Sequence, residues 1–299
     1  KDLLWEINKI EIYTDNLKNE LLLKFGNDKD HLFSIVKNHK LFNILENNLS
    51  RNKFVKKINK IDFLKLKKNY DLIINTEYNN FITKKYFNKK ILKKYNSFAY
   101  TTIIEHEEII NNVASQIFTK RGPLAFLPIS NTKTSIVYSF NKLDKRDKTQ
   151  NIQDLIQHYN FKYKIKKIRN IKSFELNSVS LRKYYYKNIL AFGDLLHKIH
   201  PLAGQGFNMT IRDIKILTNI INNKNDLGLP IDSLVNIEFE KKSKHKNFIF
   251  MNGIDFIHEF FNFESKIKND ILSKSVKIIG KNSSINKIIT KIADKGIII

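Results

Sequence analysis

The stretch from residue 193 to residue 208 constrains the fold most, because it concentrates residues that suit a ligand-facing loop. It reads Gly-Asp-Leu-Leu-His-Lys-Ile-His-Pro-Leu-Ala-Gly-Gln-Gly-Phe-Asn and contains three of the nine glycines in the chain. The apolar run 189–192 before it is typical of a buried strand, and helical periodicity follows from about residue 207 to 221. A strand, a glycine-containing loop and a helix in this order predict a backbone that approaches a bound molecule closely.

Single positions in this loop indicate which chemistry it would serve. Gly193 lets the backbone approach a ligand, and Asp194 offers a carboxylate to hydroxyl donors. Pro201 stiffens the loop, while Gly204 and Gly206 allow it to turn tightly under something flat. The loop is therefore suited to a flat ligand that carries hydroxyl groups.

The start of the following helix adds an electrostatic preference. The backbone amides of Gly206, Phe207 and Asn208 would be unpaired donors at a helix N-terminus, where partial positive charge favours an anion or an electron-rich carbonyl. A flavin needs this arrangement, because reduction places negative charge on its N1 and C2-carbonyl edge. The loop and the helix start together predict a flavin site.

The pattern Gly-Asp-x-x-His-x-x-His-Pro-x-x-Gly-Gln-Gly-x-Asn resembles the second FAD-binding motif of class A flavoprotein monooxygenases, and that of the ubiquinone-biosynthesis hydroxylases in particular. The resemblance implies that Asp194 holds the ribityl chain of FAD and that Pro201 lies beside the reactive edge of the ring. Pro201 and Gly204 would position that edge, with no side-chain nucleophile. The implied cofactor-binding residues are Gly193, Asp194, Pro201, Gly204, Gln205, Gly206, Phe207, Asn208 and His39.

Other stretches resemble the same family and extend the likeness over most of residues 30–260. Residues 118–129 are similar to a strand of its substrate domain, residues 99–106 to the strand before it, and residues 174–184 to its approach to Gly193. The predicted fold is α/β (α+β): a Rossmann-like FAD-binding domain that is incomplete at its N-terminus, a β-sheet substrate domain and a C-terminal helical segment. The predicted boundaries are 1–28 with 95–183 for the substrate domain, 29–94 with 184–245 for the FAD domain, and 246–299 for the helical segment.

The sequence departs from the family at the pyrophosphate side of the cofactor. The family begins with a strand, a Gly-x-Gly-x-x-Gly turn and a helix, whereas the only Gly-x-Gly here is Gly204 to Gly206. We therefore expect the first βαβ unit to be missing or to be supplied by another chain. The Asp-Gly motif of the family aligns with Glu77-Tyr78, and the usual Arg of the preceding helix falls at His39.

Local patterns predict the remaining elements. Strands are expected at 5–13 and 21–25 as a hairpin, at 71–75, at 189–192, and at 124–129 and 135–140 as a second hairpin; helices are expected at 33–49, 152–159 and 207–221.

Composition excludes several classes of protein. The net charge of +24 is spread along the chain and lacks a nucleic-acid-binding fingerprint, so no nucleic-acid partner is expected. With no Cys there is neither a disulfide nor a thiolate metal site, and no run approaches a membrane-spanning length. No Gly-x-Ser-x-Gly elbow occurs, which removes the starting point for a serine hydrolase.

Single clusters of residues allow alternative interpretations. Asp194, His197 and His200 could converge on one metal ion, but the flavin motif accounts for all three, and no metal is expected. Glu105-His106-Glu107 lies in a strand pattern, whose members alternate faces, and is interpreted as surface with no role. The aromatic residues between 248 and 261 favour core packing over a path for an isoprenoid tail.

The expected function is FAD-dependent hydroxylation of a prenylated phenolic ubiquinone precursor with NAD(P)H and dioxygen. The alternative is a catalytically degenerate member that binds lipid or sister biosynthetic proteins as a scaffold. The expected location is the cytoplasm. Peripheral docking on the anionic inner face of a membrane is a sharper hypothesis, because Ile285, Ile288, Ile289 and Ile292 form a stripe in the basic segment 265–299.

Overall fold

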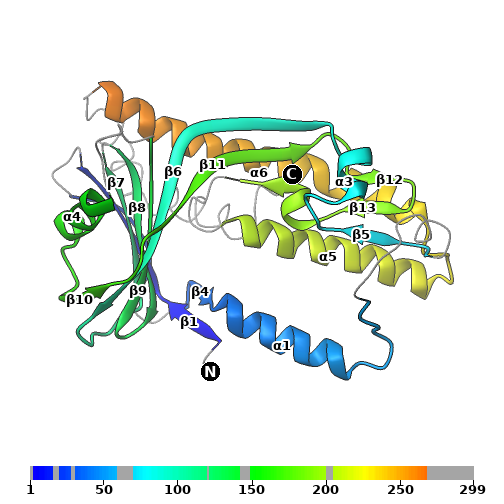
Figure 1. Cartoon of the computed structure of the whole chain (residues 1–299), viewed down its shortest axis with the longest axis horizontal. Coiled ribbons are helices and arrows are strands. Elements are labelled where there is room, and N and C mark those ends of the chain that lie inside the picture. Colours follow the sequence, from blue (N-terminus) through cyan, green and yellow to red (C-terminus); the bar gives the residue numbers. More distant parts are fainter. Residues whose placement is uncertain are drawn as a thin grey trace. The chain divides into compact units, whose positions relative to one another are not determined.

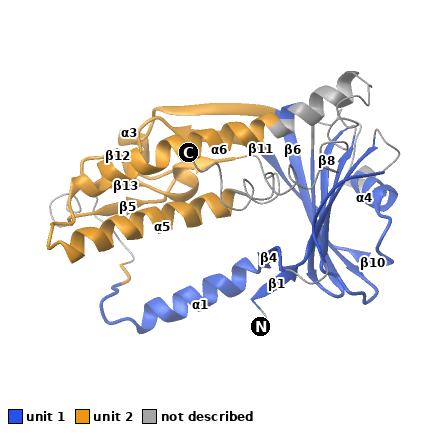
Figure 2. Cartoon of the chain, turned by 180° about the vertical axis from the view of Figure 1, so that it is seen from behind, with its two compact units in different colours: residues 1–56, 96–175, 259–298 blue, residues 57–95, 176–258, 299 orange. Residues whose placement is uncertain are grey.

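A computed structural model describes residues 3–15, 20–27, 31–58, 70–119, 121–141, 149–199 and 205–267. The chain divides into two compact units, shown in Figures 1 and 2, and each is described by itself. Unit 1 comprises residues 1–56, 96–175 and 259–298, and unit 2 comprises residues 57–95, 176–258 and 299. These units assign residues 29–56 differently from the predicted domains, and the domain assignment remains a prediction.

Sheets and helices alternate along the chain, which confirms the predicted α/β class. The largest sheet has nine strands in the order β14-β11-β6-β9-β8-β7-β2-β3, with β10 also pairing with β6. Its strands are β2 (Lys9–Thr14), β3 (Glu20–Gly26), β6 (Lys90–His106), β7 (Val113–Thr119), β8 (Gly122–Ser130), β9 (Lys133–Asn141), β10 (Ile165–Ile168), β11 (Lys172–Leu181) and β14 (His197–Lys198). The predicted hairpins are confirmed as β2–β3 and β8–β9, both antiparallel.

One face of the sheet in unit 1 is covered by helix α4 (Thr149–Tyr159), which Figure 1 shows beside it. Side chains of α4 pack with inward-facing strand residues in a single apolar cluster. Its fully buried members include Ile117, Leu124, Phe126, Ile136, Tyr138, Ile152 and Ile156. Because successive strand residues point to opposite faces, the period-2 pattern of these strands places their large apolar residues against the helix.

The stretch 33–49, predicted to be one helix, forms two elements. Phe33–Val36 is strand β4, paired antiparallel with β1 (Leu4–Ile7), and the helix α1 runs from Asn38 to Arg51. The prediction was wrong for the first four residues, because edge pairing with β1 satisfies backbone groups that helical periodicity alone would have placed in a helix. No residue of α1 is buried.

Unit 2 contains a three-stranded sheet in the order β12-β13-β5. The apolar run 189–192, predicted to be a core strand, forms β13 (Ile189–Ala191), which makes a hairpin with β12 (Tyr185–Tyr186). Lys187 adopts a left-handed conformation (φ 53°) in the turn, which a pattern of apolar residues does not reveal. β13 also pairs in parallel with β5 (Ile73–Asn75), and α3 (Phe81–Tyr86) follows β5.

Two long helices pack on the sheet of unit 2. They are α5 (Gln205–Asp226) and α6 (Ser233–Ile267), and Figure 1 shows both alongside β13. Residues from both helices join β13 in one core, with Leu190, Ile220, Val235 and Phe239 at most 1% exposed. This core fixes the strand that leads into the Gly193 loop.

Among the described residues, no helix is long and apolar enough to cross a membrane.

Candidate flavin site

The turn after β13 has a conformation that suits glycine. Gly193 has a φ of +64°, in the left-handed region, and begins the short 3₁₀ helix Gly193–Leu195. A Cβ atom placed on Gly193 would meet nothing within 4 Å, so the space beside this backbone is open. The turn is therefore exposed where a ligand could approach.

Asp194 follows at an exposed position on the same turn. Among the described residues, its carboxylate has no hydrogen-bond or ion-pair partner. Its neighbours Leu195 and Leu196 are buried and anchor the turn in the core of unit 2. An anchored turn with a free carboxylate fits the role of an acceptor for ligand hydroxyl groups.

Helix α5 supplies the second half of the predicted site. It begins at Gln205, so Gly206, Phe207 and Asn208 lie in its first turn, where backbone amides have no acceptor within the helix. A Cβ on Gly206 would lie 3.7 Å from Cγ1 of Ile199, an ordinary contact. Phe207 and Asn208 are exposed. This first turn lies at the end of the helix that has partial positive charge.

Part of the predicted loop cannot be placed. His200, Pro201 and Gly204 lie outside the described residues, so their expected contacts with the flavin edge remain predictions. His39 is an exposed residue near the start of α1 in unit 1, and its role in binding cofactor likewise remains a prediction.

A second turn lies at the same edge of the unit 2 sheet. Since β5 and β13 are parallel, with Asn75 opposite Ala191, their carboxyl ends meet at one edge, which is where ligands bind in open α/β sheets. The turn after β5 is held by side chains: Asn75 Nδ2 donates to Thr83 Oγ1 at 2.8 Å, and Asn80 Oδ1 accepts from the Thr83 amide at 2.8 Å. This braced turn presents Glu77 and Tyr78, both exposed.

A hollow of about 370 Å³ lies beside this second turn. Tyr78, Thr83 and Lys90 line it together with Leu195 from the Gly193 turn. The Lys90 ammonium donates to the Tyr78 hydroxyl at 2.7 Å and lies 4.8 Å from the ring centroid. The hollow is therefore bordered by both turns, and its rim is cationic and aromatic.

Beneath the first turn is a buried polar pair that the sequence did not reveal as a pair. His197 Nε2 lies 2.6 Å from Asp213 Oδ2, and the two side chains are 1% and 0% exposed. Asn247 of α6 donates from Nδ2 to Asp213 Oδ1 at 3.2 Å. Thus Asp213 engages His197, one of the three residues considered as a metal triad. Among the described residues, no group of three His, Cys, Asp or Glu side chains is suitably placed for a metal.

Burial shifts the pKa values of two further side chains of unit 2, Tyr184 and Arg212. Burial raises the pKa of Tyr184, and hydrogen bonds with the Asn247 and Ser180 side chains partly offset that rise. Burial also lowers the pKa of Arg212, whose guanidinium lies 4.1 Å from the Phe250 ring centroid. The polar groups around Asp213 therefore lie in a region of unit 2 from which water is largely excluded.

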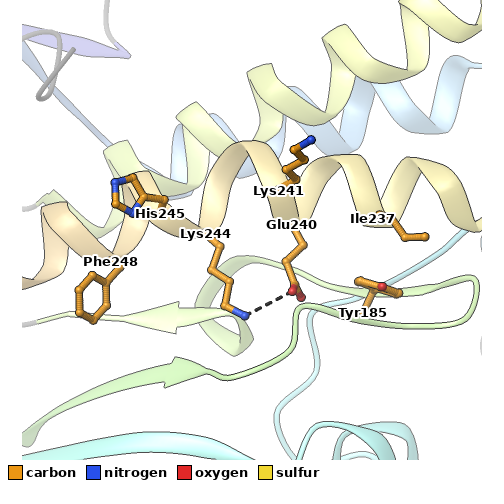
Figure 3. A pocket seen from close by; sticks show the side chains of 7 residues that line it. All are labelled: Tyr185, Ile237, Glu240, Lys241, Lys244, His245 and Phe248. Atoms are coloured by element: carbon orange, nitrogen blue, oxygen red, sulfur yellow. Dashed lines mark hydrogen bonds and ion pairs between the residues drawn. The ribbon is translucent and has the colours of Figure 1, made fainter. Parts of the chain in front are cut away.

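A larger hollow, of about 500 Å³, lies on the surface of α6 rather than at the sheet edge. Figure 3 shows its lining residues: Tyr185, Ile237, Glu240, Lys241, Lys244, His245 and Phe248. At its base Glu240 accepts a hydrogen bond from Lys244 at 3.3 Å and another from the Tyr184 amide at 2.7 Å. None of the predicted flavin-binding residues lines it, so its size does not make it the candidate site.

In unit 1, the face of the sheet opposite α4 is lined by smaller side chains. Gln116, Ala125, Val137 and Thr101 are neighbours across four adjacent strands, and all four are half-buried. They alternate with the fully buried residues that face α4. This face of the sheet is therefore a mixed apolar and polar surface.

The cluster Glu105-His106-Glu107 behaves only partly as predicted. Glu105 pairs with Arg169 at 2.6 Å and Glu107 with Lys164 at 3.4 Å, as expected for surface carboxylates. The arginine hydrogen bond lowers the pKa of Glu105. The surface interpretation was wrong for His106, which is 3% exposed and hydrogen-bonds Thr134 Oγ1 through Nε2 at 3.0 Å. Strand alternation turns it toward the α4 side, where the Thr134 hydroxyl and the Glu107 carbonyl are its hydrogen-bond partners.

Comparisons with known proteins identify similar sequences. Residues 89–223 match the family described as FAD binding domain. The chain is 27% identical over 152 residues to 3-demethoxyubiquinol 3-hydroxylase of Escherichia coli, covering 49% of this chain and 39% of that protein. It is 24% identical over 208 residues to the mitochondrial ubiquinone biosynthesis monooxygenase COQ6 of Danio rerio, covering 56% and 43%. The chain thus spans less than half the length of these relatives.

Solved structures show the same fold at low sequence identity. The p-nitrophenol 4-monooxygenase PnpA of Pseudomonas putida has a TM-score of 0.75 at 11% identity, over 98% of this chain and 82% of that one. HpxO of Klebsiella pneumoniae, solved with FAD and uric acid, has a TM-score of 0.68 at 8% identity, over 95% and 79%.

The FAD binding domain match over residues 89–223, together with the fold, defines a flavoprotein of the FAD-dependent monooxygenase type. Within that class, the chain is similar to the ubiquinone-biosynthesis hydroxylases. The resemblance inferred from residues 193–208 is thereby confirmed.

Proposed function

We propose that this chain provides the flavin-ring and substrate portions of a hydroxylase that places one oxygen atom on a prenylated phenolic ubiquinone precursor. The observation that carries the proposal is the left-handed, open Gly193 turn with the unpaired Asp194 carboxylate. Bound FAD would supply the redox chemistry that activates dioxygen, with NAD(P)H as the reductant.

The residues of this chain would contribute position and charge. Asp194 would accept hydrogen bonds from ribityl hydroxyls, and the amides of Gly206 to Asn208 would donate to the pyrimidine edge. Charge-assisted hydrogen bonds of the first kind contribute about 1.5–3 kcal/mol each. Preorganised donors of the second kind stabilise developing negative charge without reorganising at the moment of reaction.

The open face of the unit 1 sheet would contribute the substrate wall. Small side chains such as Ala125 and Val137 leave room for an aromatic ring, and Gln116 and Thr101 offer polar contacts to a phenol.

A second candidate function is a non-catalytic scaffold that binds lipid or sister biosynthetic proteins. It is favoured by Tyr78, which stands where the family has the glycine of its Asp-Gly motif and whose hydroxyl accepts a hydrogen bond from Lys90. A side chain at that position narrows the approach for a dinucleotide. The sequence also contains no Gly-x-Gly-x-x-Gly turn to bind a pyrophosphate.

Flavin retention discriminates between the two functions. We expect the 299-residue chain alone to bind FAD weakly, and the chain joined to a Gly-x-Gly-x-x-Gly strand–turn–helix unit to purify with bound flavin, measured by absorbance. The joined protein should then consume NAD(P)H faster when a prenylated phenol is added. A joined protein that folds but holds no flavin would support the scaffold function instead.

A further inference from the structure

Three elements of unit 2 meet in a buried hydrogen-bonded network beneath the Gly193 turn. His197 belongs to β14, Asp213 to α5 and Asn247 to α6. The His197 Nε2 to Asp213 Oδ2 distance is 2.6 Å, and Asn247 Nδ2 lies 3.2 and 3.4 Å from the two Asp213 oxygens. Both Asp213 oxygens therefore have partners.

A buried His–Asp pair is a poor choice if its only role is to fill the core. Burying a carboxylate requires full hydrogen-bonding compensation, and well-packed apolar residues in place of a buried polar pair are often neutral or stabilising. Apolar residues elsewhere on α5 are as deeply buried: Met209 and Ile220 are 0% and 1% exposed. A polar pair differs from apolar packing in one respect: its hydrogen bonds fix the direction and register in which β14 and α5 meet.

The pair connects the two halves of the candidate flavin site. His197 is three residues after Asp194, and its backbone is held by pairing with Ser180 of β11. Asp213 lies two turns into α5, about 11 Å along the axis from Gly206 at 1.5 Å per residue. A fixed His197–Asp213 contact thus ties the Asp194 turn to the axis of the helix that carries the first-turn amides.

We propose that His197 and Asp213 are positioning residues that set Asp194 relative to the first-turn amides of α5, so that both engage the same flavin. This inference rests on the proposed function. Asn247 is the brace that holds the Asp213 carboxylate in the orientation that His197 needs.

The chain contains natural probes at this position. Its two methionines are Met209, which packs with Ile199 and Ile254 in a small buried cluster, and Met251, which packs against that cluster. Methyl resonances from ¹³C-methionine therefore report on the corner between β14, α5 and α6. They serve as indicators of folding and of flavin binding in one spectrum.

The test compares the full chain with Asp213→Asn and with an apolar double variant, His197→Phe/Asp213→Leu. Each is titrated up to millimolar concentration with FMN, which has the flavin ring and the ribityl chain but has no dinucleotide pyrophosphate to be bound.

We expect the parent to show an FMN-dependent shift of the Met209 signal, and both variants to bind FMN at least about ten-fold more weakly. The double variant should keep the melting temperature of the parent and two dispersed methionine signals. Lys241→Ala, on α6 at the hollow of Figure 3, is the control and should bind FMN as the parent does.

The outcomes separate the two proposals. If the apolar double variant binds FMN as tightly as the parent, the pair serves packing only and the positioning inference is overturned. If the folded parent shows no FMN-dependent shift, the flavin site itself is overturned, whatever the variants do. If the Asp213→Asn variant does not fold, the double variant alone decides whether the pair serves positioning or packing.

Discussion

Ala191 and Asn75 lie opposite each other in parallel strands, and the amide of the next residue, Phe192, donates to the Asn75 carbonyl at 2.9 Å. More than a hundred residues separate the two strands in sequence. Their pairing brings the Asp194 turn and the Glu77–Tyr78 turn to one sheet edge. We therefore expect substitutions in either turn to affect the same candidate site.

Asp194→Ala should weaken flavin binding in the chain joined to a Gly-rich unit. Loss of a charged acceptor for ribityl hydroxyls costs about 1.5–3 kcal/mol, or roughly ten- to a hundred-fold in affinity. Fluorescence titration with FAD measures the change. Asp226→Ala, at the exposed C-terminal end of α5, is the matched control and should leave affinity unchanged. Equal affinity in the Asp194 variant and the parent would remove Asp194 from the site.

Gly193→Ala should destabilise unit 2 by about 1–2 kcal/mol, because a non-glycine residue at a φ of +64° is strained even where no atom blocks its Cβ. Gly253→Ala provides the comparison, since its Cβ would also meet nothing within 4 Å but its position is helical. There the same change should stabilise by up to about 1 kcal/mol. Urea unfolding measures both, and shifts of the same sign would contradict the assignment of strain to Gly193.

Phe126→Ala and Leu127→Ala should differ sharply although the residues are adjacent in β8. Phe126 is 2% exposed in the cluster against α4, so truncation should cost about 3–5 kcal/mol. Leu127 is half-buried on the opposite face of the sheet, so its truncation should lower stability clearly less. The Leu127→Ala change should also raise the KM of the joined enzyme for an apolar substrate. Thermal unfolding with steady-state kinetics tests this, and similar losses of stability would show that both faces are core.

Removal of residues 265–299 should abolish binding to vesicles that contain acidic lipid. The expected helix with Ile285, Ile288, Ile289 and Ile292 lies outside the described residues, so the prediction rests on the sequence. Co-sedimentation at low and high salt measures it, and the full chain should be released by salt. Vesicle binding that survives the truncation would assign membrane contact to another surface.

The sequence by itself determined the elements whose signals are local. Alternating residues predicted the β8–β9 hairpin, and the glycine spacing from Gly193 to Asn208 predicted a strand, a turn and a helix start, because turn chemistry and capping depend on near neighbours in the chain. The same spacing carried the resemblance to the family. It could not show that residues 33–36 pair with β1, since the partner strand lies in another segment.

Only the tertiary structure decided which residues meet. It paired β13 with β5 and with β12, turned His106 inward, and brought His197 to Asp213 across sixteen residues. Each of these depends on where a distant segment lies and on which buried polar group needs a partner. Periodicity reports the face of an element, but hydrogen-bond satisfaction inside a core is settled by the packed structure as a whole.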